Sequence, residues 1–158
     1  METETATNWL TDDEQCAWRT YLDVNRLLTY QLEKDLQPFG LTINDYEILV
    51  NLSEAPDHRL RMSDLAAATL QSKSRLSHQI TRMENAGLVR RENCESDRRG
   101  LYAVLTEQGM DTMRNVAPHH VDSVRRHFID LLSPEALADL RKALTPIAEQ
   151  LRGLRGKP

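Results

Sequence analysis

The sequence predicts a mainly α-helical fold with a small β-hairpin, and three observations support this. Apolar residues recur at helical spacing in residues 13–37 and again in residues 106–154. Between these regions, residues 62–105 contain a short helix, a tight turn, a second helix and two strands joined by a polar loop. That order is typical of a winged helix-turn-helix. We therefore expect a winged helix-turn-helix domain at residues 41–105, flanked by N- and C-terminal helices that form a dimerisation domain.

Residues 1–12 are expected to form a flexible arm, because their Glu- and Thr-rich composition offers little to bury. A helix should follow at residues 13–37, with Thr11 or Asp12 as its cap. Its apolar stripe is broad enough to be buried against more than one partner. We interpret these partners as the helix's own domain and a second subunit, and we assign residues 13–40 to dimerisation.

The next segment supplies the first elements of the winged domain. A helix at residues 41–53 should begin at Thr42, whose hydroxyl can cap it. Residues 59–61 are expected to form a short strand that joins the sheet of the wing. Ser63 should then cap a short helix at residues 64–69, whose small alanines allow close packing.

The second helix of the turn, at residues 73–85, has two faces of opposite chemistry. Leu76, Ile80 and Met83 share one side. The other side is polar or basic, and its side chains can hydrogen-bond to base edges or phosphates. It carries Ser74, His78, Thr81 and Arg82, flanked by Lys73, Arg75 and Ser77, with Ser72 as the helix cap. Solvated faces usually mix Glu with Lys, whereas Glu84 is the one acid here, so we interpret this helix as a DNA-reading helix; an ordinary solvated face is the alternative.

A polar loop at residues 93–100 is expected to form the wing. Asp97 can hold one arginine in place and leave the other free to enter a narrow, strongly negative minor groove. The two arginines are Arg98 and Arg99. A solvated basic turn is the alternative interpretation. The flanking strands are expected at residues 88–92 and 101–105.

The C-terminal part is expected to be helical. Residues 106–132 should form one long helix that Pro118 kinks. Pro134 then starts a last helix, whose leucines repeat at threes and fours as in a coiled coil. We expect residues 106–154 to intertwine with a partner subunit, with residues 155–158 as a tail; an intramolecular bundle is the alternative.

Charge is distributed unevenly along the chain. The whole chain has 20 Lys and Arg and 24 Asp and Glu, a formal net charge of −4. Residues 59–100 nevertheless contain nine basic and five acidic side chains. A basic domain on an acidic body is the polarity that a dimeric DNA-binding protein requires.

Several short motifs together carry a family resemblance. They are Gly40-Leu41-Thr42 with Tyr46 and Leu49, Arg61-Met62-Ser63-Asp64-Leu65-Ala66, Arg82-Met83-Glu84, Gly87-Leu88-Val89-Arg90-Arg91, and Asp97-Arg98-Arg99-Gly100 before Leu105-Thr106. With these motifs the chain, from about Trp18 to Leu151, resembles transcriptional regulators of the MarR (multiple antibiotic resistance regulator) family. The resemblance implies a homodimeric, cytoplasmic regulator, most often a repressor, that binds a palindromic double-stranded DNA operator and releases it when a small molecule binds. The sign of regulation stays open between repressor and activator, and release by a small ligand is frequent in the family, not universal. The resemblance also implies that Asp97 braces the wing and that Arg99 is the minor-groove arginine.

Composition limits the other function classes. A chain of 158 residues with 28% charged and 40% hydrophobic residues is typical of a soluble protein and too short for a catalytic domain beside a DNA-binding one. We find no secretion signal, no run of about 20 apolar residues, and no phosphate-binding loop or catalytic motif. We therefore expect a cytoplasmic protein that is not an enzyme, with no cofactor and no membrane partner.

Three smaller features remain. Trp18, Tyr21 and Tyr46 are weak candidates for an effector pocket, although aromatic residues at helical spacing are more often core. The nearby histidines, at positions 119, 120 and 127, are expected to lie on a solvated helix face without a metal. Cys16 and Cys94 form no disulfide framework. Two alternatives stay open: a redox-responsive regulator that uses one of these cysteines, and a winged module that binds protein without reading DNA.

Overall fold

The computed structural model describes residues 7–94 and 97–155, with the side chains of residues 97–99 outside the description. It confirms a mainly helical chain with a small antiparallel sheet. The helices are α1 (Asp12–Leu36), α2 (Ile43–Glu54), α3 (Met62–Ala68), α4 (Lys73–Asn85), α5 (Glu107–His127) and α6 (Pro134–Arg155). Short 3-10 turns lie at Gln37–Phe39, Pro56–His58 and Ile129–Leu131, and the strands are β1 (Arg59–Arg61), β2 (Val89–Cys94) and β3 (Asp97–Leu105).

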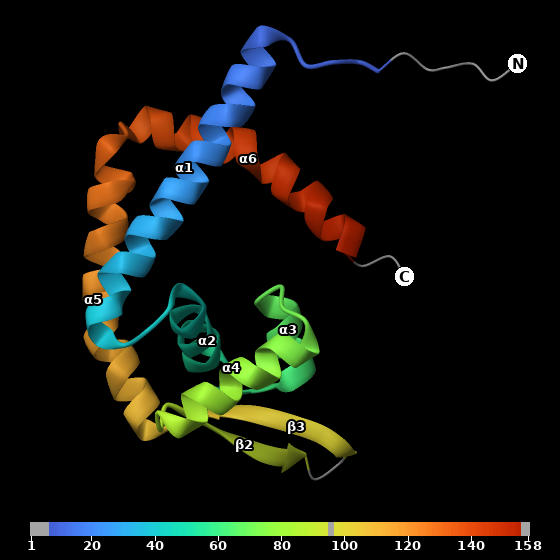
Figure 1. Cartoon of the computed structure of the whole chain (residues 1–158), viewed down its shortest axis with the longest axis vertical. Helices are drawn as coiled ribbons and strands as arrows, with labels where there is room; N and C mark the ends of the chain where they lie inside the picture. Colours follow the sequence, from blue (N-terminus) through green and yellow to red (C-terminus); the bar gives the residue numbers. More distant parts are fainter. Residues whose placement is uncertain (1–6, 95–96, 156–158) are drawn as a thin grey trace, which may run out of the picture.

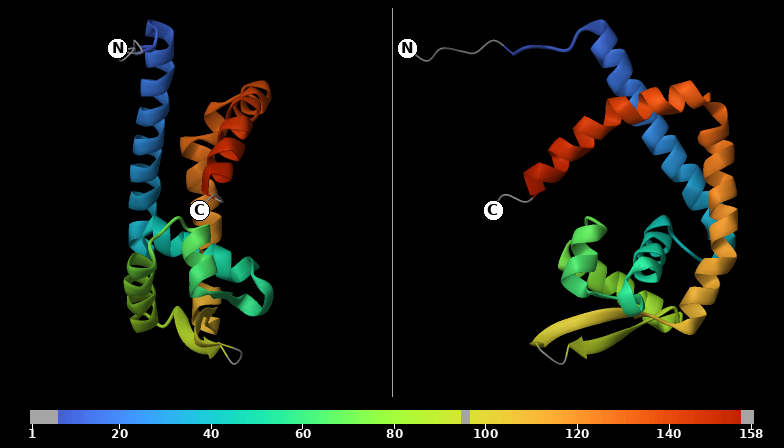
Figure 2. Two further views of the ribbon diagram at one scale, coloured as in Figure 1. Left: turned by 90° about the vertical axis from the view of Figure 1, so that its right-hand side faces the viewer. Right: turned by 180° about the vertical axis from the view of Figure 1, so that it is seen from behind.

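The molecule has two halves (Figure 1). In one half α2, α3 and α4 pack over a sheet of order β1-β3-β2, which is the predicted winged domain. In the other half α1 and α5 extend away from this domain, and α6 crosses from the far end of α5 back toward α3 (Figures 1 and 2). The wing hairpin and the free end of α1 therefore lie at opposite ends of the molecule.

The core lies in the winged half. Leu49, Leu76 and Ile80 are fully buried there, and Val116 brings α5 onto the same cluster. The predicted apolar face of α4 is thus confirmed as its buried face. Burial of this face stabilises the helix more than its propensity does, because short isolated helices are marginal in water.

Several helix ends are fixed by the predicted residues. Thr42 begins α2 in a capping box: its hydroxyl accepts from the Asp45 amide at 3.1 Å, and the Asp45 carboxylate accepts from the Thr42 amide at 2.9 Å. Ser72 caps α4, and Gly87 ends the turn that follows α4 in the left-handed region, at φ +75°. At the start of α1 the cap is Thr11.

Two local predictions were wrong. Ser63 does not cap α3, because the helix starts directly after β1 at Met62 and the Ser63 hydroxyl lies inside it. The fifth helix ends at His127, several residues earlier than expected. Pro118 lies inside α5, as the sequence predicted, and α6 likewise continues through Pro146.

A polar cluster that the sequence did not predict joins the end of α1 to α5. Asp35 accepts a hydrogen bond from the Ser123 hydroxyl at 2.6 Å and lies 3.1 Å from Nε2 of His127. Gln31 donates to the same carboxylate at 3.0 Å. Ser123 is itself buried, so this cluster fixes the angle between the two long helices.

The Asp35 cluster should make stability depend on acid pH. The hydrogen bond from Ser123 is the largest cause that holds the pKa of Asp35 below its ordinary value. A carboxyl group with a lowered pKa in the folded state contributes stability above its unfolded pKa, and the contribution is lost as pH falls through the folded pKa. Asp35→Asn should therefore lower the melting temperature at pH 7. Between pH 5 and pH 3 the melting temperature of this variant should fall by less than that of the wild type. Asp139→Asn, at an exposed pair with Lys142, is the control; equal acid profiles for the two variants would contradict the assignment.

Candidate nucleic-acid interface

The exposed face of α4 carries every side chain on this helix that the sequence predicted to contact DNA. Leu76, Gln79, Ile80 and Met83 are buried, whereas the predicted residues of α4 are all exposed. They form one surface that begins at the helix N-terminus. The exposed residues are Lys73, Ser74, Arg75, Ser77, His78, Thr81 and Arg82.

The first turn of α4 is free to meet an anion. Ser72 accepts a hydrogen bond from the Arg75 amide at 3.2 Å, and this bond uses one of the amides that helix starts leave unsatisfied. The first turn contains no acidic residue. Lys73 and Arg75 therefore add positive charge to the positive end of the helix dipole, as suits a phosphate contact.

Two of the predicted residues, Ser77 and Thr81, accept hydrogen bonds from a side chain of strand β2. Arg91 of β2 donates to the Ser77 carbonyl at 2.7 Å, to the Ser77 hydroxyl at 3.2 Å and to the Thr81 hydroxyl at 3.1 Å. Its guanidinium also pairs with Glu84. Arg91, which was not among the predicted site residues, thus ties the reading helix to the sheet.

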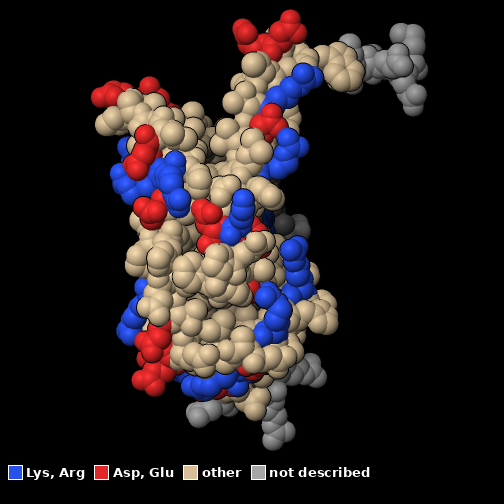
Figure 3. Space-filling model, turned by 60° about the vertical axis from the view of Figure 1, so that its left-hand side comes forward, with Lys and Arg blue, Asp and Glu red and all other residues tan. Residues whose placement is uncertain are grey.

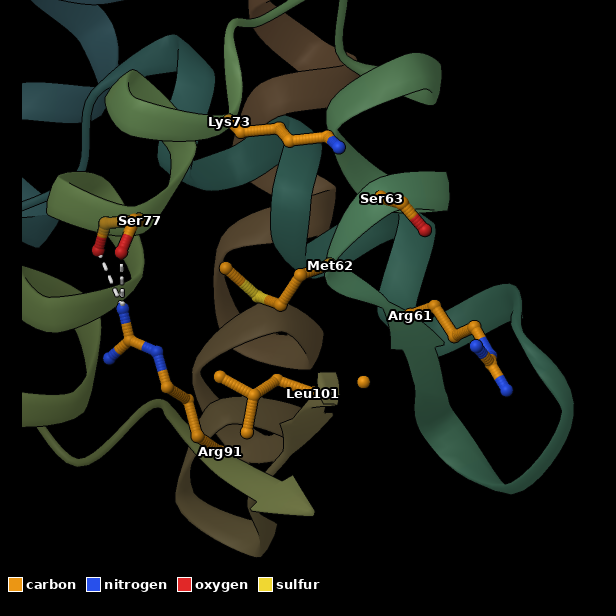
Figure 4. A pocket seen from close by; sticks show the side chains of 8 residues that line it. Arg61, Met62, Ser63, Lys73, Ser77, Arg91 and Leu101 are labelled. Atoms are coloured by element: carbon orange, nitrogen blue, oxygen red, sulfur yellow. Dashed lines mark hydrogen bonds between the residues drawn. The ribbon is translucent and has the colours of Figure 1, made fainter. Parts of the chain in front are cut away.

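A shallow hollow of about 300 Å³ lies between α3, α4 and the wing (Figure 4). Arg91 reaches from the strand to Ser77 on one side of it, while the Lys73 side chain extends along its rim toward α3. Arg61, at the end of β1, also lines it. The hollow is therefore bordered by basic side chains from more than one element.

The side chain of Arg82 is fixed on the body of the domain. Both of its terminal nitrogens donate to the carboxylate of Asp45 in α2, at 3.0 and 2.6 Å. Arg82 was predicted to contact DNA because it shares the outer face of the helix. The sequence of α2 did not single out Asp45 as its partner, because Glu47 and Glu54 are carboxylates on the same helix.

The wing contacts are not described by the structure. β2 and β3 pair in antiparallel fashion, with Val89 opposite Leu105, and the pairing shifts at Asn93 and Cys94. Asp97, Arg98 and Arg99 lie at the start of β3, and their side chains fall outside the described part of the chain. Their predicted roles therefore remain predictions.

The flank of the molecule has a different charge pattern from the face of α4. In Figure 3, lysine and arginine side chains intermingle with aspartate and glutamate along its length. Exposed ion pairs at the end of α5 include Arg125 with Asp130 at 2.5 Å and Arg126 with Asp122 at 3.5 Å. The exposed face of α4 differs because its basic residues in the first turn have no acidic neighbour within that turn.

Comparisons with known proteins agree with this geometry. The sequence model of the MarR family matches residues 39–100. The HTH-type transcriptional regulator PecS of Dickeya dadantii is 30% identical over 133 residues, which cover 81% of this chain and 77% of PecS. The chain belongs to the MarR family.

Solved structures of MarR-family proteins support the same assignment. AbsC of Streptomyces coelicolor is 82% identical, with a TM-score of 0.89 over 93% of this chain and 99% of AbsC. Sco3205 of the same organism, crystallised in complex with DNA, is 43% identical with a TM-score of 0.88, over 92% of each chain. This MarR-family chain is therefore a transcriptional regulator and not an enzyme.

The structure does not bring the predicted effector residues together. Trp18 and Tyr21 stack on α1 with ring centroids 5.9 Å apart, and both are about half exposed. Tyr46 is buried in the winged domain against His120, at 4.3 Å between ring centroids. Since α1 rises about 1.5 Å per residue, Trp18 lies roughly 27 Å along it from the end that adjoins α2. An apolar groove of about 500 Å³ between α1, α5 and α6 includes Tyr21 without the other two.

The histidines of α5 have separate neighbours. His119 lies against Phe39, at 5.0 Å between ring centroids, whereas His120 packs on Tyr46 and His127 on Asp35. His120 and His127 are partly buried, so the expectation of a solvated face holds only for His119. Burial lowers the pKa of His120, which favours its neutral form. Within the described residues, no three potential metal ligands come together.

The two cysteines have different surroundings. Cys16 is exposed in the first turns of α1, and Cys94 is buried at the end of β2. Arg61 donates to the Cys94 sulfur at 3.3 Å, and Tyr102 lies at hydrogen-bonding distance for sulfur, 4.0 Å. Among the helices that the structure describes, none combines the length and apolar character that a membrane span needs.

Proposed function

We propose that this MarR-family chain is a homodimeric, cytoplasmic repressor that binds a palindromic DNA operator. In this proposal the exposed face of α4 enters the major groove, and the β2–β3 wing reaches the adjacent minor groove. One observation carries it: α4 buries its apolar face completely, and the face that remains begins with basic and hydroxyl side chains and no acid.

We expect the exposed side chains of α4 to make different kinds of contact with DNA. Lys73 and Arg75, in the first turn, are placed to contact phosphates or guanine edges. Ser74 and His78 project from the same surface and can hydrogen-bond to bases. The wing would add Arg98 and Arg99, with Asp97 as the brace.

A second copy of the chain accounts for the exposed apolar surface of the other half. Trp18 and Tyr21 of α1, whose rings stack, are 53% and 48% exposed, and Ile147 and Leu151 of α6 are 55% and 57% exposed. Monomeric soluble proteins rarely leave large contiguous apolar patches in water. A two-fold dimer would cover it and would place two copies of α4 about 34 Å apart, which is one turn of DNA.

A small apolar effector would act on that spacing. The groove between α1, α5 and α6 offers about 500 Å³ lined mainly by apolar side chains such as Leu28 and Phe128. A ligand that binds better to a dimer with the wrong spacing lowers operator affinity by that preference and no more. We therefore propose this groove as the effector site, in place of a site formed jointly by Trp18, Tyr21 and Tyr46.

The proposal is tested by the sequence preference of α4 variants. The probe is a duplex selected from a random library by the wild-type protein. Arg75→Ala and His78→Ala should each weaken binding to it by about 5- to 150-fold, or 1–3 kcal/mol, and relax the preference at the bases they contact. Arg26→Ala, on exposed α1, is the matched control and should change neither. Failure of the wild type to enrich any duplex would leave the protein-binding module as the better account.

A further inference from the structure

Asp45 is a buried carboxylate at the centre of the winged domain. It is 1% exposed and lies in the first turn of α2. Its Oδ1 accepts from Nη2 of Arg82 at 2.6 Å and from Nε2 of Gln79 at 3.0 Å. Its Oδ2 accepts from Nη1 of Arg82 at 3.0 Å and from the Thr42 amide at 2.9 Å. Both oxygens are therefore occupied by two donors each.

The network extends along α4 to the turn before it. Gln79 accepts a hydrogen bond at 2.9 Å from Nε2 of Gln71, which lies just before the cap Ser72. Asp45 thus holds α4 near its last turn through Arg82, at its middle through Gln79, and at its start through Gln71. These three attachments fix both the position and the rotation of the helix about its axis.

The pairing of Arg82 with Asp45 has a directional geometry. A planar guanidinium and a planar carboxylate that share two parallel hydrogen bonds tolerate little rotation, whereas an ammonium group would not impose this constraint. Rotation of α4 by one residue would turn its outer face by about 100°. The pair therefore controls which side chains are presented to a groove.

We propose that Asp45 and Arg82 are positioning residues for operator recognition: they set the rotation of α4 so that Arg75 and His78 meet bases, and Arg82 makes no contact with DNA. This inference rests on the proposed function. It assigns Arg82 a role opposite to the one that its place on the outer face of α4 suggests.

Arg82→Gln and Arg75→Gln form a matched pair that separates positioning from contact. The measurement is the dissociation constant for the selected duplex and for a random-sequence duplex of equal length, at several salt concentrations. Arg82→Gln should weaken binding to the selected duplex tenfold or more, leave the random duplex within about twofold, and leave the slope of log affinity against log salt unchanged. Arg75→Gln should also weaken binding to the selected duplex, but because it removes a positive charge from the DNA surface it should weaken the random duplex too and make the salt slope shallower.

Further variants distinguish a loss of helix positioning from a loss of folding. Arg82→Lys keeps the charge and loses the paired geometry, so it should not restore recognition of the selected duplex. Asp45→Asn should reproduce the Arg82→Gln phenotype, and the double variant should be no worse than either single one, because the two residues act as one unit. Variants are compared only where their thermal unfolding is cooperative and they remain dimeric.

The outcomes are distinct. A reduced salt slope and equal losses on both duplexes for Arg82→Gln would make Arg82 a phosphate contact and overturn the inference. Unchanged affinity for the selected duplex, or full rescue by Arg82→Lys, would overturn it as well. If the wild type binds neither duplex, the proposed function itself fails. Non-additive losses of thermal stability in the Asp45 and Arg82 single and double variants would then show that the pair is purely structural.

Discussion

Gly109→Ala is expected to lose about 3 kcal/mol of stability, although alanine is the better helix former by about 1 kcal/mol. Gly109 is buried in the first turn of α5. A Cβ added there would lie 2.0 Å from the carbonyl oxygen of Leu88 and 2.8 Å from Cδ1 of Leu105. The oxygen belongs to the backbone, so no change of rotamer relieves the overlap, and α5 would have to move away from the wing.

The start of α5 is docked onto the wing by the residue that caps it. Thr106 donates to the Gly87 carbonyl at 2.6 Å and accepts from the Gly109 amide at 2.9 Å. A displaced α5 would break this hydrogen bond, which joins the winged half to the long helices. Gly109→Ala should therefore weaken both folding and any coupling between the two halves.

Gly153→Ala is the matched control. Gly153 lies in α6, and a Cβ there would meet nothing within 4 Å. Alanine should then raise stability by about 0.5–1 kcal/mol through its lower backbone entropy cost. The free energies of unfolding of both variants are measured in urea. Equal stability of Gly109→Ala and Gly153→Ala would show that α5 does not approach the Leu88 carbonyl closely at Gly109.

Local patterns predicted those parts of the fold that neighbouring residues determine. Thr42 and Ser72 were identified as caps because a hydroxyl before an apolar run satisfies free amides whatever the rest of the chain does. The two faces of α4 followed from a period of 3.6 residues, and the structure buries Leu76, Ile80 and Met83 as expected. The prediction of a reading helix needed no tertiary information.

Contacts distant in sequence were not predictable in this way. Asp45 and Arg82 are 37 residues apart, and Asp35 and Ser123 are 88 residues apart. No periodicity links such residues, because their meeting depends on how whole helices pack. The separation of Trp18, Tyr21 and Tyr46 has the same cause, since the first two lie on the part of α1 that is distant from the winged domain and the third lies in the core.

The turn between α3 and α4 shows another limit. Leu70 adopts a left-handed backbone, at φ 57°, and is 68% exposed. Such a conformation favours glycine, so the residue type gave no indication of it. Leu70 ends α3 in a Schellman turn, in which the Gln71 amide donates to the Ala66 carbonyl at 3.0 Å and the Leu70 amide donates to the Ala67 carbonyl at 3.4 Å. Gly87 ends α4 in the same way and could be predicted, because glycine is the usual residue at that position.

The largest functional effect is expected from salt. Each subunit would bring the cations of the α4 N-terminus and of the wing to the DNA, in a region with nine basic and five acidic residues. If the dimer neutralises six or more phosphates, affinity should fall by about 10³-fold or more between 50 and 200 mM salt, because the released counterions oppose binding. Arg26→Gln, a change on exposed α1, should leave this dependence unaltered.

The salt dependence of duplex binding is therefore the most direct test of the claim that the exposed face of α4 lies on DNA. Fluorescence anisotropy titrations of the selected duplex, at KCl concentrations from about 50 to about 200 mM, measure it. We predict a straight line of log affinity against log salt with a slope of about −5 or steeper, and a shallower slope for Arg75→Gln. A slope near zero in the wild type would contradict it.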